Sequence, residues 1–228
     1  MSIEQRIREV EARIAAACSR CGRSREDVNV IAVTKYVSVD TAREAVECGQ
    51  RHVGENRWQD AEAKWLSIGS AAVWHFIGHL QTNKAKDIVG KFAYVHSLDR
   101  LSLAKELDRQ AAKSGAAIDC FIQVNVSGEE TKYGLAPDQL VPFAEQLRDY
   151  PHLRIIGLMT MAPYETEAEE TRPVFRGLRE LRDNLNRTGA LGYAVEHLSM
   201  GMSNDFEVAI EEGATWIRLG TVLVGKES

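Results

Sequence analysis

Apolar residues recur at helical spacing at the start of the chain and predict a helix there. They are Ile3, Ile7, Val10, Ile14 and Ala17, with glutamate and arginine residues between them. Gly22 marks the expected end of this helix. The next apolar run, NVIAVTKYV from Asn29 to Val37, is short and rich in β-branched residues, which predicts a buried strand.

The rest of the chain alternates between helical and strand-like patterns. Helical patterns cover residues 40–49, 58–66, 84–89, 101–112, 137–147, 175–185 and 205–212. Strand-like runs cover residues 52–53, 73–78, 92–96, 118–126, 153–159, 194–198 and 215–219, and 54–56 is expected to be a loop. An alternating series implies a parallel sheet with helices outside it. With about eight units, we predict an α/β fold, a single (β/α)8 TIM barrel with an extra N-terminal helix, and keep an open doubly wound sheet as the alternative.

Composition narrows the class of protein. The 228 residues contain no Gly-, Pro- or Ser-rich linker, so residues 1–228 are expected to form one domain. A formal net charge of −5 argues against a general nucleic-acid or anionic-membrane binder, because phosphate neutralisation requires clustered Lys and Arg. No apolar run approaches the roughly 20 residues that span a bilayer. The charged N-terminus lacks a signal-type apolar block, so we expect a cytoplasmic protein.

Lys35 stands directly after the apolar run of the first predicted strand. TIM-barrel enzymes place their chemistry at the C-terminal ends of strands, so this lysine would face the barrel mouth or its interior. Desolvation there lowers the pKa of an amine and makes it a better nucleophile toward a carbonyl. The alternative is a lysine that only ends the strand and reaches solvent.

A turn near the C-terminus has the composition of an anion site. The segment His197–Gly213 reads as strand, turn and helix. Gly201 allows close backbone approach, and Ser203 is expected to be the N-cap of the helix. Free N–H groups at such a turn can hold an anion, and the hydroxyls of Ser199 and Ser203 add donors.

The segment that follows, Thr215–Gly225, predicts a second contact of the same kind. Arg218 closes a strand, and Gly220 and Thr221 provide another close backbone approach and another hydroxyl. In the predicted barrel these loops follow strands seven and eight, where such barrels often bind phosphate. We therefore expect a phosphate site, with an ordinary helix cap and strand end as the alternative.

A set of motifs runs through the chain. They are AVTKYV around Lys35, HVGENRWQD, WHFIGHLQTNK, QVNVSGEETKYG, GLMTMAP, LSMGMSNDFEVAIEEG and IRLGTVLVG. Together they resemble the pyridoxal phosphate homeostasis protein family, also called the YggS/PROSC family, over nearly the whole chain. The resemblance implies a fold like the barrel of the alanine racemase N-terminal domain.

The resemblance also implies a cofactor, pyridoxal 5′-phosphate (PLP), bound covalently as a Schiff base on Lys35. The family's phosphate contacts fall on Ser199, Gly201, Ser203, Gly220 and Thr221, and Arg218 is implied to lie near the pyridine nitrogen. Asn56 and His79 match family positions by motif and complete the expected cofactor-binding residues. His75 and His79 are four residues apart without an evident third ligand, so packing and loop hydrogen bonds are favoured over a metal site.

Arg218 beside the ring nitrogen would weaken the cofactor as an electron sink, because arginine cannot accept a proton at ordinary pH. A racemase also needs an acid/base group on each face of its substrate. Alanine racemases supply the second group from a tyrosine of a β-rich domain, which is not expected here because the chain ends three residues after Gly225. The possible substitutes are Tyr36, Tyr133 and Tyr164. Tyr36 adjoins Lys35 on the predicted strand and is expected to point to the opposite side.

We therefore expect a PLP carrier without robust catalysis that acts in vitamin B6 homeostasis. It would influence amino-acid and keto-acid balance, pass its cofactor to PLP-dependent enzymes and exist as a monomer. Two alternatives use the same lysine: a single-domain PLP-dependent amino-acid racemase, and a Schiff-base aldolase acting on a phosphorylated sugar.

Overall fold

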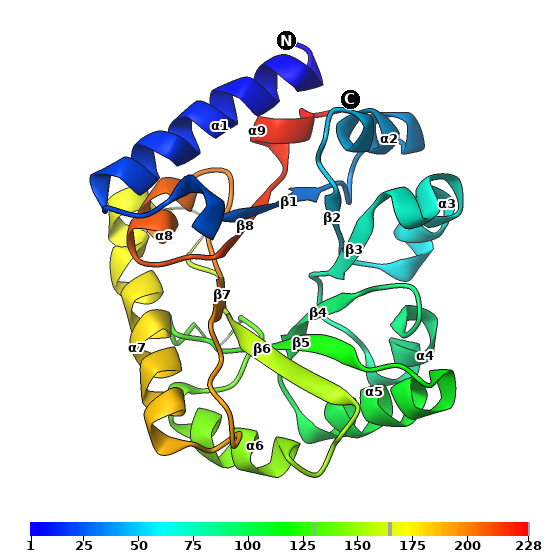
Figure 1. The fold of residues 1–228 in the computed structure, drawn as a ribbon, viewed down its shortest axis with the longest axis vertical. Helices are drawn as coiled ribbons and strands as arrows, with labels where there is room; N and C mark the ends of the chain where they lie inside the picture. Colours follow the sequence, from blue (N-terminus) through cyan, green and yellow to red (C-terminus); the bar gives the residue numbers. More distant parts are fainter. Residues whose placement is uncertain (130, 164–165, 228) are drawn as a thin grey trace.

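Parallel strands close into a barrel in the order in which they occur along the chain, β1 to β8. The strands are β1 Asn29–Val33, β2 His52–Glu55, β3 Val73–Phe76, β4 Tyr94–Leu98, β5 Ile118–Gln123, β6 Leu153–Met159, β7 His197–Ser199 and β8 Trp216–Leu219. Figure 1 shows this computed structural model, which describes residues 1–129, 131–163 and 166–227. The prediction of a TIM barrel is confirmed, and the open doubly wound sheet is excluded because β1 pairs with β8.

Helices surround the barrel (Figure 1). They are α1 Ile3–Arg20, α2 Val39–Glu47, α3 Trp58–Ile68, α4 Ala85–Ile88, α5 Leu101–Ser114, α6 Leu140–Leu147, α7 Arg172–Thr188, α8 Phe206–Glu211 and α9 Thr221–Val224. Short 3-10 helices are η1 Arg25–Asp27, η2 Gly69–Ala71, η3 Thr82–Lys84, η4 Pro137–Gln139 and η5 Ala168–Thr171. Among the residues with described positions, no helix is long and apolar enough to cross a membrane.

The predicted extra N-terminal helix is α1, which packs against α8 and α9. Its first turn is closed by a capping box, in which the Gln5 backbone N–H donates to Ser2 Oγ and the Ser2 backbone N–H donates to Gln5 Oε1. Its buried face includes Val10 and Ile14, at the helical spacing that the sequence shows. The helix therefore covers the segments that follow β7 and β8.

Most strands differ somewhat from the sequence prediction: β3, β5, β7 and β8 are one to three residues shorter, β4 lies two residues later, and β1 and β2 differ next to the site. β1 ends at Val33 and not at Val37, because the Val37 N–H donates to the Thr34 carbonyl and turns the chain. β2 includes Gly54 and Glu55, which were predicted as loop. A Cβ on Gly54 would lie 2.8 Å from a methyl of Ile31, so this glycine serves close packing between strands and does not mark a turn.

The barrel has an inner and an outer apolar layer. The inner cluster consists of Ile31, Phe121, Met159 and Trp216, with Tyr94, Ile156 and Met161 packed against it. The outer layer lies between the strands and the helices and contains most of the remaining buried aliphatic side chains. The inner positions near the C-terminal ends of the strands are polar, and they form the candidate site described below.

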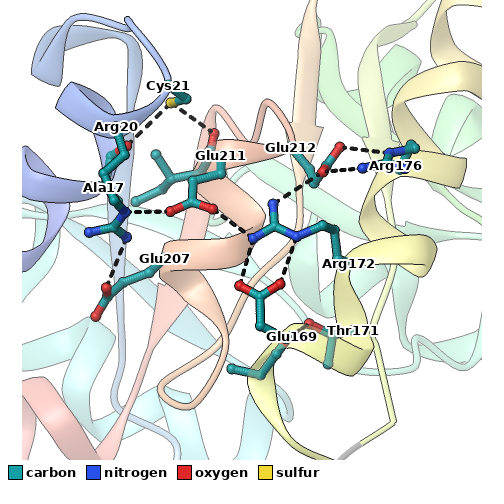
Figure 2. A network of polar contacts seen from close by, with 12 residues as sticks. Ala17, Arg20, Cys21, Glu169, Thr171, Arg172, Arg176, Glu207, Glu211 and Glu212 are labelled. Atoms are coloured by element: carbon teal, nitrogen blue, oxygen red, sulfur yellow. Dashed lines mark hydrogen bonds and ion pairs between the residues drawn. The ribbon is translucent and has the colours of Figure 1, made fainter.

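A network of arginines and glutamates joins α8 to α7 and α1 (Figure 2). The carboxylate of Glu212, only 5% exposed, contacts the guanidinium groups of Arg172 at 3.2 Å, Arg176 at 3.1 Å and Arg179 at 3.1 Å. Burial alone would raise the pKa of Glu212, but hydrogen bonds from Arg176 and Arg172 bring it below its ordinary value. These ion pairs hold the end of α8, and α8 in turn supports the turn after β7.

Replacing Glu212 by Gln is expected to lower the free energy of unfolding by about 2 kcal/mol, because three arginines lose a buried partner. The matched control is Glu169→Gln, since Glu169 pairs with the same Arg172 but is 71% exposed. The control should cost less than about 1 kcal/mol. Urea unfolding of both variants measures the difference, and equal costs would contradict the assigned role of the buried carboxylate.

Candidate functional site

Lys35 lies in the turn directly after β1, at the C-terminal end of the barrel, and is partly buried. Its Nζ is 4.9 Å from the centroid of the Tyr36 ring, and Tyr36 is 78% exposed. The expectation that Tyr36 points away from Lys35 is therefore wrong. Strand alternation ends at Val33, and the turn brings the two neighbouring side chains together.

A buried ion pair that sequence reasoning missed holds this turn. The ammonium group of Lys64 in α3 donates to the Thr34 carbonyl at 2.6 Å and to Glu55 Oε1 at 2.9 Å. The Thr34 hydroxyl donates to the same carboxylate oxygen at 2.6 Å, and all three residues are buried. Because Thr34 precedes Lys35, these bonds fix the backbone from which the Lys35 side chain extends.

The turn after β7 differs from its prediction. The N-cap of α8 is Asp205 and not Ser203, and α8 has only six residues. The Met202 N–H donates to Asp205 Oδ1 at 2.6 Å, which forms the local turn and leaves Ser203 free of the helix. The Ser203 hydroxyl instead accepts a hydrogen bond from the Gly220 N–H at 3.3 Å, so it links the loops after β7 and β8.

Two glycines shape these loops. Gly201 has a φ of +91°, and a Cβ there would lie 2.6 Å from the Cβ of Ala209, so only glycine fits without displacement. Its carbonyl accepts a hydrogen bond from the Arg218 backbone N–H at 3.0 Å. At Gly220 a Cβ would meet its nearest neighbour, Val33, at 3.8 Å, which is an ordinary van der Waals distance, so close packing does not require this glycine. Thr221 follows as the exposed first residue of α9.

Arg218 extends into the barrel beneath these loops and is buried. One terminal nitrogen donates to the Ser199 hydroxyl at 2.7 Å, and the other donates to the Thr160 carbonyl at 2.9 Å. Burial lowers the pKa of Arg218 to about 10, against the attraction of Asp205, so the group remains a cation at neutral pH. A guanidinium has more N–H donors than these two bonds use, so it can still bind an acceptor from the mouth.

Asn56 and His79 line one cavity of about 600 Å³ beside the mouth, together with Tyr133. The His79 ring stacks on the Tyr133 ring, with centroids 3.9 Å apart, and burial lowers the pKa of His79 despite the nearby Asp99. Asn56 Oδ1 is buried and has no hydrogen-bond partner among the described residues. This amide oxygen is an unused acceptor at the edge of the site.

The structure thus brings most of the predicted residues to the C-terminal ends of five strands. Ser199 is bonded to Arg218, Ser203 to Gly220, and Gly201 to the Arg218 backbone, whereas Asn56 and His79 share the neighbouring cavity. Lys35 forms no hydrogen bond to any of them within the described residues. The specific contacts of these residues with a cofactor stay predictions, and Tyr164 lies outside the described residues.

A row of histidines beneath Arg218 was also missed. His96 Nδ1 lies 2.9 Å from the Ser199 hydroxyl, His96 Nε2 lies 3.0 Å from His75 Nδ1, and His75 Nε2 lies 2.9 Å from His52 Nδ1. The signal was one histidine in each of three consecutive predicted strands, which local pattern reading does not connect. His75 was expected in packing or loop contacts, and it lies buried inside the barrel.

Comparisons with known proteins identify the family of this chain. The family described as "Alanine racemase, N-terminal domain" matches residues 7–228. A pyridoxal phosphate homeostasis protein of Aquifex aeolicus is 45% identical over 227 residues, covering 99% of each chain. One of Pseudomonas aeruginosa is 41% identical over 225 residues, covering 98% of this chain and 95% of that one.

A solved structure extends the comparison. PipY of Synechococcus elongatus, solved with PLP bound, is 36% identical and superposes with a TM-score of 0.85, covering 98% of this chain and all of that one. The resemblance inferred from the motifs is confirmed by these matches. The chain belongs to the family of pyridoxal phosphate homeostasis proteins, built on the barrel of the alanine racemase N-terminal domain.

Proposed function

We propose that this protein binds PLP at the barrel mouth, holds it covalently through Lys35 Nζ and acts in vitamin B6 homeostasis. The observation that carries the proposal is that a lysine amine follows β1 and a buried guanidinium, Arg218, lies on the neighbouring strand β8, both at the C-terminal end of the barrel. PLP-bound PipY and the relatives named pyridoxal phosphate homeostasis protein support the choice of cofactor.

The residues present fit such a group. The Arg218 guanidinium has unused donors, and Asn56 Oδ1 is a buried acceptor without a partner among the described residues. We assign the phosphate to the loops of Gly201, Ser203, Gly220 and Thr221, and the ring nitrogen to Arg218. The Ser199 hydroxyl, expected among the phosphate donors, is fully buried and bonds to Arg218 and His96, so we assign it to holding Arg218. When bound, PLP supplies an aldehyde that reacts with an amine and a ring that can withdraw electrons.

The chain's own groups favour a carrier over an enzyme. Arg218 stays protonated and can donate to the ring nitrogen, but it offers no proton acceptor there, which weakens electron withdrawal. Lys35 extends from a backbone that Lys64 holds through the Thr34 carbonyl, whereas the neighbouring Tyr36 is 78% exposed. The names of the relatives, which describe homeostasis and not a reaction, agree with this proposal.

The cellular role completes the proposal. A carrier of this kind keeps reactive free PLP low, releases it to PLP-dependent enzymes and so influences amino-acid and keto-acid balance. We propose that it works as a monomer in the cytoplasm. Four free cysteines, Cys18, Cys21, Cys48 and Cys120, are compatible with a reducing compartment.

Replacing Lys35 by Ala should abolish the covalent complex. Purified wild-type protein mixed with PLP should be yellow, and borohydride should fix one PLP to the Lys35-containing peptide. Lys35→Ala should show only the spectrum of free PLP and no fixed adduct, as read by absorbance and mass spectrometry. A colourless wild-type protein would overturn the proposed function, and a borohydride-fixed sugar phosphate without PLP would favour the aldolase alternative.

Replacing Gly201 by Ala should displace the loop after β7 and weaken phosphate binding. We expect the dissociation constant for PLP to rise about tenfold or more, and that for pyridoxal, which lacks the phosphate, to change little. The control is Gly213→Ala, at a glycine that also has a positive φ, +102°, but where the added Cβ would make only ordinary van der Waals contact, 3.5 Å from Arg179 Cδ. This control should lower the free energy of unfolding by about 1 kcal/mol and leave the ratio of the dissociation constants for PLP and pyridoxal unchanged. An equal loss of affinity for PLP and for pyridoxal in Gly201→Ala would contradict the assignment of the phosphate to this loop.

The alternative of a PLP-dependent racemase remains testable, because Tyr36 lies beside the Lys35 amine. The carrier predicts that no L- or D-amino acid is racemised by the PLP-loaded protein at a rate near 1 per second, roughly the lower end for ordinary enzymes. Chiral chromatography measures the rate. Faster turnover that is lost in both Lys35→Ala and Tyr36→Phe would establish the racemase.

A further inference from the structure

Three histidines form an ascending row through the interior of the barrel. Gly54 pairs with His75 and His75 pairs with Tyr94, so each histidine from His52 to His96 lies two residues higher along its strand than the one before. The row begins at the partly buried His52, near the N-terminal end of the barrel, and ends at Ser199 and Arg218 beneath the mouth. His75, His96 and Ser199 are fully buried.

Aromatic rings enclose the row. The Tyr94 ring stacks on His75 at 4.3 Å between centroids, and the Phe121 ring stacks on His96 at 4.2 Å. Trp216 lies 4.9 Å from the His52 ring and 5.0 Å from the His75 ring. Because the ring faces offer no hydrogen-bond partners, the imidazole nitrogens of the row bond to one another. The row is therefore continuous from His52 to Ser199.

The Arg218 guanidinium determines which atom donates and which accepts in every hydrogen bond of the histidine row. Arg218 can only donate, so Ser199 Oγ accepts from it. The Ser199 hydroxyl then donates its own proton to His96 Nδ1, which is its other partner among the described residues. A neutral imidazole has one donor and one acceptor, so His96 Nε2–H donates to His75 Nδ1. By the same rule His75 Nε2–H donates to His52 Nδ1, and the tautomers follow from the network.

The surroundings keep the row uncharged. Burial, with the neighbouring His96 and His52, lowers the pKa of His75 well below its ordinary value. Burial, with Arg218, does the same for the pKa of His96, and burial together with Arg51 lowers the pKa of His52. A proton added to any of these rings would set two donors face to face, so the neutral, one-directional arrangement satisfies every nitrogen between Ser199 and His52.

We propose that His52, His75 and His96 are positioning residues that act through Ser199 to fix the Arg218 guanidinium toward the ring nitrogen of the cofactor. The proposal rests on the proposed function for the identity of that cofactor. Because the Ser199 proton is held by His96, a lone pair of Ser199 must face Arg218. Ser199 and the Thr160 carbonyl then hold the guanidinium from below, and its remaining N–H groups are available to an acceptor at the barrel mouth.

The direction of the row is tested without any cofactor. In protein labelled with ¹⁵N-histidine and free of PLP, long-range ¹H–¹⁵N NMR at pH 7 should show His52, His75 and His96 as neutral Nε2–H tautomers. Single His→Gln variants assign the signals. A neutral Nδ1–H tautomer or an imidazolium at any of the three would overturn the proposed direction, whatever the protein binds.

The effect on the cofactor is tested by comparing PLP with 1-deazapyridoxal 5′-phosphate, in which C–H replaces the ring nitrogen. Wild-type protein should prefer PLP by about tenfold or more, as expected when one charge-assisted hydrogen bond is lost. In His96→Leu the preference should fall to within about threefold of unity. The control is His197→Leu, which removes a partly buried histidine of β7 that bonds to Thr215 and not to the row, and it should keep the wild-type preference.

Each outcome decides a separate point. An unchanged preference in His96→Leu would refute the positioning role alone, whereas failure of wild-type protein to bind PLP would refute the proposed function. If His96→Leu does not fold, Ser199→Ala replaces it, because it removes a single hydroxyl and should lower the preference in the same way.

Discussion

The candidate site depends on one buried cation, the Arg218 guanidinium. A charge taken out of water is tolerated only where strong partners replace the water, and here Ser199 and the Thr160 carbonyl do so. The attraction of Asp205 also favours the charge. The Gly201 carbonyl holds the Arg218 backbone, and His96 holds the Ser199 hydroxyl from beneath. A cation held in this way is oriented before any ligand arrives.

The outer helices support the C-terminal end of the barrel in two places. Lys35 extends from a turn whose backbone is fixed by Lys64 and Glu55, on the side of α3. The loop after β7 is supported by α8, and α8 is joined to α7 and α1 by the arginine–glutamate network of Figure 2. The helices thus provide rigidity to a mouth that is built from turns. The same division of roles is common in TIM barrels, where strand-end loops carry function and the scaffold carries stability.

The features that could be predicted from the sequence are those set by local patterns or by recognisable motifs. The alternation of patterns predicted the barrel, and the strand ends predicted that Lys35, Arg218 and the turn after β7 lie at one end. It failed where a residue's role is set by distant neighbours. Ser203 looked like a cap, but Asp205 two residues later takes that place, and Ser203 bonds to Gly220 instead. Gly54 looked like a loop residue, but close packing against Ile31 places it inside β2.

The Lys64–Glu55 ion pair and the histidine row could not be predicted, because both depend on neighbours that are distant along the chain. Lys64 stands on a helix with a charged face, and nothing in its surroundings along the chain predicts burial against Glu55. The histidine row requires the register of three strands, which a periodic pattern does not supply.

We propose that Arg218 donates to an unprotonated ring nitrogen of PLP, and the ¹⁵N chemical shift of ring-labelled PLP in the protein at neutral pH tests this most directly. We predict the shift of a neutral pyridine that accepts a hydrogen bond, and the shift of a protonated pyridinium would contradict the proposal.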